Sequence, residues 1–220
     1  MSAETKQVIP LFPLQSVLFP GGYLPLRIFE PRYLEMIARV HKAGQPFGVV
    51  SLIEGGEVRR RDDRVPEGGA AFLREKFQPI GTLAHIQVLE REGPGLLQIR
   101  CTGGQRFKIL QSDCLPHGLW MAEVALLGLD AEVPVPADLA PAAVLLQTLL
   151  HSLEQGAAAE DMPLQPPYLW EDSGWLANRW CEMLPLSGDE RQRLMQLDNP
   201  LVRLELVADQ LDRLGLPPGQ

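Results

Sequence analysis

The stretch IGTLAHIQVLEREGPGLLQIRCTGGQRFKIL, residues 80–110, decides the fold class of this chain. From Ala84 to Val88 apolar and polar side chains alternate, which distinguishes the two faces of a β-strand. The EGPG segment is typical of a turn, and the pair Gly103 and Gly104 could supply the positive φ angles of a tight hairpin. The stretch therefore predicts three consecutive antiparallel strands.

The chain on either side of this stretch shows the same strand-like pattern up to about residue 130. Short apolar runs are separated by glycine and proline: QVIPLF, YLPLRIF, FGVVSLI, GAAFL and WMAEVALL. One helix interrupts them, because Pro31 suits a first helical turn, apolar residues follow at three- and four-residue spacing, and Gly44 offers a stop. We predict a β-rich lobe with one embedded helix, spanning residues 7–130.

The remaining chain has a helical period. The proline-rich link EVPVPADLAP, residues 132–141, precedes a leucine stripe, and three shorter helices follow. Their start signals are a capping-box spacing of Ser187 and Glu190, and Asn199 before Pro200. The predicted stripe consists of Leu145, Leu146, Leu149, Leu150 and Leu153. Residues 131–216 are predicted to form a helical lobe, which makes the fold class α+β.

For two short motifs we prefer a structural interpretation over a binding function. RRRDDR, residues 59–64, interleaves its arginines with acidic residues, which favours a charged hairpin tip over a nucleic-acid site. PPY, residues 166–168, resembles a proline-rich peptide ligand only faintly. We expect instead a loop that Tyr168 and Trp170 anchor on the helical lobe.

Composition narrows the possible partners. The 220 residues carry a formal charge of −8, and a pI near 5.1 disfavours nucleic acid and anionic lipid. The three cysteines give no complete disulfide framework, and neither a leader nor a membrane-spanning run is evident, so we expect a soluble, cytoplasmic protein.

Motifs for catalysis or metal binding are absent from the sequence. It has no GxSxG, HExxH or GxxxxGK[ST] pattern, and its four histidines are isolated from one another. We therefore predict no catalytic residues, no metal and no cofactor. A tertiary cluster such as His85 with Asp113 or Glu123 stays open, because convergence in space leaves no local spacing.

Two segments carry a resemblance to a known family. IPLFPLQSVLFPGGYLPLRIFEPRYLEMI, residues 9–37, resembles the start of the N-terminal, substrate-binding domain of Lon proteases, and residues 80–110 resemble its central meander. With the helical tail the likeness extends from residue 7 to about 214. We expect a stand-alone form without the ATPase and peptidase modules, so proteolysis and ATP hydrolysis are not carried over.

The resemblance implies a PUA-like pseudo-barrel followed by a helical bundle, and a role in contacting polypeptides. Within residues 9–37, Pro10, Pro13, Pro20 and Pro25 are expected to limit strand length and blunt sheet edges, while Gly21 and Gly22 form a turn. A second reading is that part of this segment stays exposed as an apolar rim for an extended chain. The residues expected at such a rim are Arg27, Phe29, Arg32 and Tyr33.

Three functions follow from these patterns. The leading hypothesis is a non-enzymatic module that binds unfolded or specific polypeptides, as an adaptor or a holdase-like factor. An RNA-binding protein is the first alternative, by analogy with other PUA-like folds. An enzyme with an unrecognised site is the second.

Overall fold

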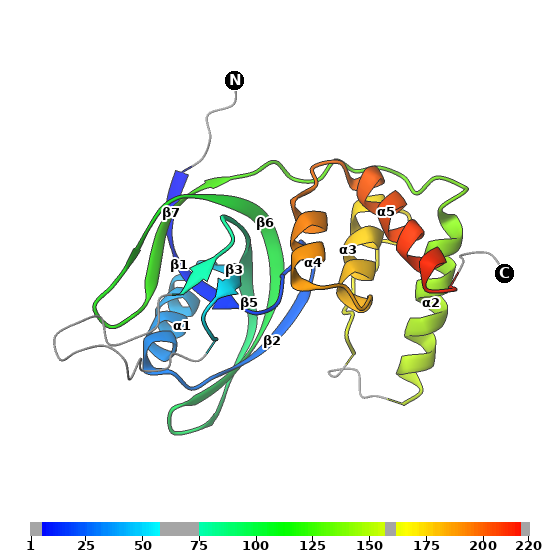
Figure 1. Cartoon of the computed structure of the whole chain (residues 1–220). Helices are drawn as coiled ribbons and strands as arrows, with labels where there is room; N and C mark the ends of the chain where they lie inside the picture. The colour runs from blue at the N-terminus through cyan, green and yellow to red at the C-terminus, as the bar shows by residue number, and fades with distance from the viewer. Residues whose placement is uncertain (1–5, 58–74, 157–161, 217–220) are drawn as a thin grey trace. The chain divides into compact units, whose positions relative to one another are not determined.

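The computed structural model describes residues 6–57, 75–156 and 162–216 (Figure 1). They form two compact units: the first comprises residues up to Leu18 and from Leu24 to Leu127, and the second comprises Phe19–Tyr23 and the chain from Gly128 onward. The predicted GAAFL strand and the predicted charged tip at residues 59–64 lie outside the described residues.

The first unit is built on a seven-stranded sheet. The main path of the sheet has the order β1-β7-β6-β5-β3-β4, and β2 pairs with β6. Because β1 pairs antiparallel with β7 and parallel with β3, the sheet closes on itself, which confirms the predicted β-rich pseudo-barrel. The strands are β1 (Lys6–Leu14), β2 (Tyr23–Ile28), β3 (Phe47–Glu54), β4 (Lys76–Phe77), β5 (Ile80–Gly93), β6 (Leu96–Cys114) and β7 (Trp120–Leu126).

The stretch at residues 80–110 forms two strands, so the prediction of three is wrong. β5 and β6 make one long hairpin that turns at Gly95, whose φ is 75° (Figure 1). Gly103 lies within β6 opposite Ala84, and a Cβ on Gly104 would lie 2.5 Å from His85 Nε2. The glycine pair therefore permits close packing of the two strands and does not turn the chain.

The prolines of β1 also differ from the prediction. β1 runs through Pro10 and Pro13, both of them buried, so neither proline limits the strand or covers an exposed edge. β1 pairs with β7 along Lys6–Leu11, which includes Pro10. It pairs with β3 along Leu11–Leu14, which includes Pro13, so each proline lies in a paired part of the strand. The predicted turn at Gly21 is confirmed: Gly21 has a φ of 72°, and Gly22 N donates to Phe19 O at 2.9 Å.

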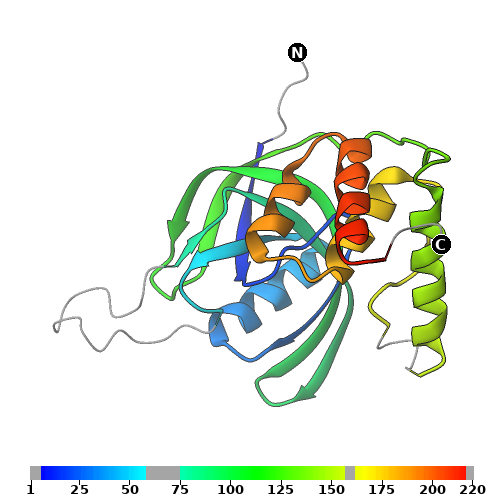
Figure 2. The ribbon, with the colours of Figure 1, turned by 45° about the vertical axis from the view of Figure 1, so that its right-hand side comes forward.

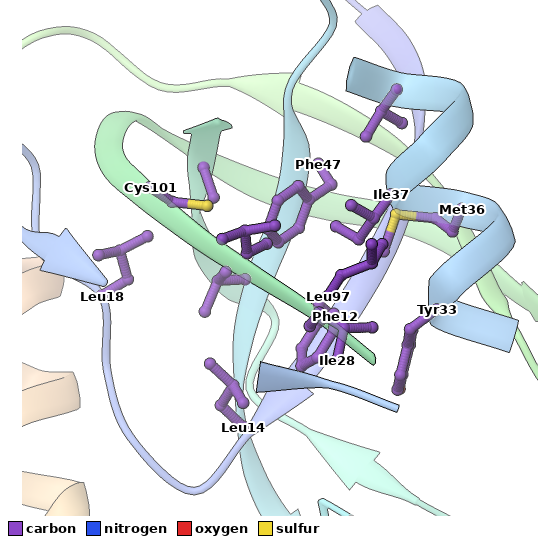
Figure 3. Close-up of a cluster of buried hydrophobic side chains, with 14 of the residues drawn as sticks. Phe12, Leu14, Leu18, Ile28, Tyr33, Met36, Ile37, Phe47, Leu97 and Cys101 are labelled. Atoms are coloured by element: carbon purple, nitrogen blue, oxygen red, sulfur yellow. The ribbon is translucent and has the colours of Figure 1, made fainter. Parts of the chain in front are cut away.

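The helix α1 (Pro31–Ala43) covers one side of the pseudo-barrel, as predicted. Pro31 is at its first turn, and Gly44 ends it in the left-handed conformation with a φ of 62°. Tyr33, Met36 and Ile37 point from α1 into a core that also contains Phe12 and Phe47 (Figure 3).

Four helices form most of the second unit: α2 (Ala140–Glu154), α3 (Ser173–Met183), α4 (Gly188–Gln196) and α5 (Pro200–Arg213). α3 packs against the other three (Figure 2), and all its residues from Ser173 to Cys181 are buried. Ser187 and Glu190 form the predicted capping box, and Asn199 caps α5. The leucine stripe of α2 is only partly confirmed, because Leu146 and Leu150 are buried whereas Leu149 is exposed.

Buried arginines hold the second unit together. Arg203 on α5 is completely buried and donates to Asp130 Oδ2 at 2.5 Å, to Asn178 Oδ1 at 2.9 Å and to Leu194 O at 3.0 Å. Arg179 on α3 donates to the carbonyl oxygens of Pro20 and Gly21, which explains why Phe19–Tyr23 belongs to this unit. Among the described residues, none of the helices is long and apolar enough to cross a membrane.

Candidate functional site

A small pocket of about 90 Å³ lies in the first unit, where β2 leads into α1. It is formed by three segments that the fold brings together: the end of β1, the second half of β2 with the chain up to the first turn of α1, and Glu57. The lining residues are Phe12, Leu14, Leu26, Arg27, Ile28, Phe29, Glu30, Tyr33 and Glu57.

Side chains of the hydrophobic core form the floor of this pocket. Phe12 from β1 and Tyr33 from α1 stack with ring centroids 4.1 Å apart, and Ile28 from β2 lies beside them (Figure 3). All three are buried. Because close-packed core side chains cannot easily shift, the floor is apolar and of fixed shape.

The rim carries one exposed aromatic ring among charged groups. Phe29 follows β2 directly and is 54% exposed. Arg27 is exposed and forms an ion pair with Glu92, with 2.7 Å between Nη2 and Oε2. Glu57 accepts a hydrogen bond of 2.6 Å from Gln15 N. An apolar ring bordered by a few charges suits a ligand that is mainly apolar.

Arg32 lies outside the pocket lining and is buried. Its Nη1 donates to Gly118 O at 2.8 Å, its Nη2 pairs with Glu75 Oε1 at 3.1 Å, and its Nε pairs with Glu30 Oε2 at 3.1 Å. Burial by itself lowers the pKa of Arg32, but Tyr33, Glu75 and Glu30 together outweigh burial and raise that pKa. Arg32 therefore stays charged, and it holds the start of α1 beside the pocket.

The structure brings three of the four predicted rim residues together. Arg27, Phe29 and Tyr33 line the pocket, although Tyr33 belongs to its buried floor. Arg32 contacts the floor of the pocket, because its guanidinium lies 4.4 Å from the Tyr33 ring centroid. Contact of these residues with a polypeptide stays a prediction.

Sequence reasoning missed other members of the site. Phe12 and Leu14 line it from β1, but their hydrophobicity is equally typical of any core strand. Glu75 fixes Arg32 and also accepts from Trp120 Nε1 at 2.6 Å, and no local spacing connects these three residues. The alternation of β2, with Leu26 and Ile28 on the inner face, is the one sequence signal for this wall of the pocket.

His85, Asp113 and Glu123, the suggested cluster, line neither this pocket nor the pocket formed by residues 132–134 and 168–172. His85 is exposed on β5 opposite Thr102, and Glu123 on β7 pairs with Lys6 at 3.6 Å. Within residues 6–57, 75–156 and 162–216, no three side chains of His, Cys, Asp or Glu are arranged to hold a metal ion.

Comparison with known proteins identifies the family. The family model described as the substrate-binding domain of ATP-dependent protease La (LON) matches residues 8–213. The chain belongs to this family. The matched family is the substrate-binding domain of that protease and not its catalytic module.

Two relatives are similar to this chain in sequence. Cereblon of Gallus gallus is 26% identical over 173 residues, which are 77% of this chain and 32% of that protein. Lon protease of Anaeromyxobacter dehalogenans is 27% identical over 218 residues, which are 96% of this chain and 24% of that protein. The chain thus spans between a quarter and a third of the length of these relatives.

Solved structures show the same fold. A Lon N-terminal domain protein from Xanthomonas campestris matches with a TM-score of 0.66 and 28% identity, over 96% of this chain and 99% of that one. The N-terminal domain of the Lon protease from Mycobacterium avium complex matches with a TM-score of 0.59 over 94% and 98% of the two chains, at 16% identity. The predicted family and α+β architecture are therefore confirmed.

Proposed function

We propose that this chain binds extended polypeptide segments at the pocket beside Phe29, as an adaptor or a holdase-like factor. The observation that carries the proposal is an exposed aromatic ring, Phe29, at the mouth of a fixed apolar pocket in a member of a substrate-binding family. Aromatic anchors in such positions dominate the binding energy of many protein interfaces.

The size of the pocket favours a peptide side chain over a small-molecule ligand. Its volume is about 90 Å³, whereas pockets for drug-sized ligands are about 300–1,000 Å³. One apolar side chain of an extended segment can enter such a space, while the neighbouring part of the segment lies against Phe29. This mode gives weak and broad affinity, because few contacts are made and the segment loses conformational freedom on binding.

The charged groups at the rim determine which class of ligand this pocket can bind. Arg27 is paired with Glu92, and Arg32 is buried with Glu30 and Glu75, so neither presents a free cation to a phosphate backbone. Binding of an apolar segment should therefore change little with moderate salt, whereas binding of a nucleic acid would weaken steeply.

Fluorescence anisotropy of a labelled, permanently unfolded polypeptide tests the proposal. We expect saturable binding to the unfolded chain, and no binding of a folded protein or an RNA oligomer. Phe29→Asp should weaken the binding about tenfold or more, because it places a charge where apolar contact is made.

Ile53→Asp is the matched control. Ile53 is 48% exposed on β3 of the same unit and does not line the pocket, so this variant adds the same charge elsewhere. Circular dichroism would confirm that both variants are folded. Equal losses in the two variants, or no loss in either, would show that the pocket beside Phe29 is not the binding site.

A further inference from the structure

The second unit carries a larger, open pocket of about 700 Å³. Two segments that are far apart in the sequence form it, the link before α2 and the segment that leads into α3. The lining residues are Glu132, Val133, Pro134, Tyr168, Leu169, Trp170, Glu171 and Asp172. The pocket lies wholly within this unit.

Backbone hydrogen bonds hold these two segments side by side. Val135 N donates to Glu171 O at 2.9 Å, and Ser173 N donates to Val133 O at 2.8 Å. Ser173 Oγ adds a bond of 3.1 Å to Pro134 O. The arrangement is a short antiparallel bridge, so the backbone of the pocket is fixed before any ligand binds.

Aromatic rings provide one wall. Tyr168 and Trp170 line the pocket with their ring centroids 5.2 Å apart, and both are half-buried. Trp175 on α3 supports them from the core, edge to face with Trp170 at 5.0 Å. The predicted anchoring of this loop by Tyr168 and Trp170 is thereby confirmed. Ring faces that remain accessible in a fixed position can stack on a planar or cationic group.

The charged groups of the lining are all acidic. Glu132 lies on one segment, and Glu171 and Asp172 lie on the other. Among the described residues, no lysine, arginine or histidine lines the pocket. Asp172 is held in place because its Oδ1 accepts from Trp175 N at 2.6 Å. Burial and then the charge of Glu154 raise the pKa of Tyr168, which indicates a fourth carboxylate near the same wall. No metal cluster exists in the described residues, so these carboxylates do not form a metal centre.

We propose that this pocket binds an arginine side chain of a polypeptide. Arginine fits better than the other side chains, because its planar guanidinium can stack on an indole face while its N–H groups donate to carboxylates. The inference rests on the proposed function in one respect, namely that the natural ligand is a polypeptide. It specifies this ligand further, as an extended segment that contains arginine.

The decisive experiment is a titration of the full chain with the peptide acetyl-Gly-Gly-Arg-Gly-Gly-amide, followed by NMR of the ¹⁵N-labelled indole groups. The matched peptide has citrulline in place of arginine, which keeps the shape and removes the charge. We expect the Trp170 indole signal to shift with the arginine peptide, and the citrulline peptide to bind about tenfold more weakly. Equal binding of the two peptides would overturn the proposal.

Two protein variants locate the site. Trp170→Leu should weaken binding of the arginine peptide about tenfold by removing the stacking surface. Because Trp170 also packs on Trp175, the second variant is Glu132→Gln, an exposed change on the opposite segment that should not disturb folding and should also weaken binding. Unchanged affinity in Glu132→Gln and Trp170→Leu, or spermidine binding as tightly as the peptide, would overturn the assignment.

The two proposals fail in different ways. Phe29→Asp removes the apolar anchor of the first unit but leaves every residue of this pocket unchanged, so it should bind the arginine peptide as the native chain does. If the native chain binds the arginine peptide but not the unfolded polypeptide, the pocket beside Phe29 is wrong and the arginine site stands. If the reverse is found, the arginine site is wrong.

Discussion

At the scale of single residues, three buried arginines connect segments that are distant in the sequence. Arg32 is 6% exposed, Arg179 is 2% exposed and Arg203 is fully buried. Each donates to at least one main-chain carbonyl oxygen as well as to a carboxylate. Burying a charge is tolerated only with such partners, and removal of one partner is therefore severe.

We predict that Arg203→Met lowers the free energy of unfolding by about 3 kcal/mol, because the change removes a buried cation from Asp130 and a donor from the carbonyl of Leu194. Urea denaturation followed by circular dichroism measures this loss. Arg213→Met is the control, since Arg213 is an exposed arginine in the last turn of the same helix. A similar change in both variants would contradict the role assigned to Arg203.

At the scale of elements, β5 approaches its neighbours so closely that one position requires glycine. A Cβ on Gly81 would lie 2.3 Å from Val49 O and 2.7 Å from Phe107 Cζ, and the backbone oxygen cannot move aside. We predict that Gly81→Ala lowers the free energy of unfolding by about 3 kcal/mol through overpacking. Gly93→Ala in the same strand has nothing within 4 Å and should change it by less than about 0.5 kcal/mol. Thermal unfolding of both variants would test the difference, and equal midpoints would refute it.

The capping box of α4 predicts a pH-dependent contribution to stability. The Ser187 hydroxyl, and then its backbone N–H, donate to Glu190 and lower the pKa of that carboxyl group. A folded-state pKa below the unfolded one stabilises the protein above the ordinary carboxyl pKa, and this stability is lost as the pH falls through the lowered value. We expect Glu190→Gln to be destabilised relative to the native chain at pH 7, but no longer at about pH 2.

The partner residue supplies the control for this prediction. Ser187→Ala should lower the free energy of unfolding by about 1 kcal/mol at pH 7. In that background Glu190→Gln should show a smaller pH-dependent difference, because the hydroxyl donor is absent while the backbone N–H remains. Urea denaturation at both pH values measures these effects. A pH-dependent difference as large in the Ser187→Ala background as in the native one would assign it to another group.

The features that could be predicted from the sequence are those that depend on residues close together in the chain. Pro31 with Gly44, Ser187 with Glu190, and Asn199 define helix ends through contacts within a few residues, and all appear as predicted. Gly103 and Gly104 were wrongly assigned to a turn. A glycine pair is typical both of a turn and of two closely packed strands, and only the position of His85 in the folded chain distinguishes the two. The burial of Arg32 was likewise invisible, since Glu75 and Gly118 meet it only in the folded chain.

At the scale of the whole molecule, the chain joins its two units more than once. Phe19–Tyr23 connects β1 to the first residue of β2, yet it belongs to the second unit, where α3 holds it through Asn178 and Arg179. Loss of the second unit would therefore release the connection between two strands of the first. A single division of the chain near residue 130 leaves this segment in the first lobe. The local composition of five residues could not reveal that they belong to the second unit.

Thiol reactivity tests whether the two units unfold together. Burial raises the pKa of Cys101 and of Cys181 to about 12 each, so both thiols are protonated and shielded in the folded state. Cys101 reports on the first unit and Cys181 on the second. In a Cys114→Ser background, which removes the exposed thiol, we predict that both become reactive toward a thiol reagent at the same urea concentration. Mass spectrometry of labelled peptides distinguishes the two sites. Separate midpoints would show that the segment Phe19–Tyr23 does not couple the units.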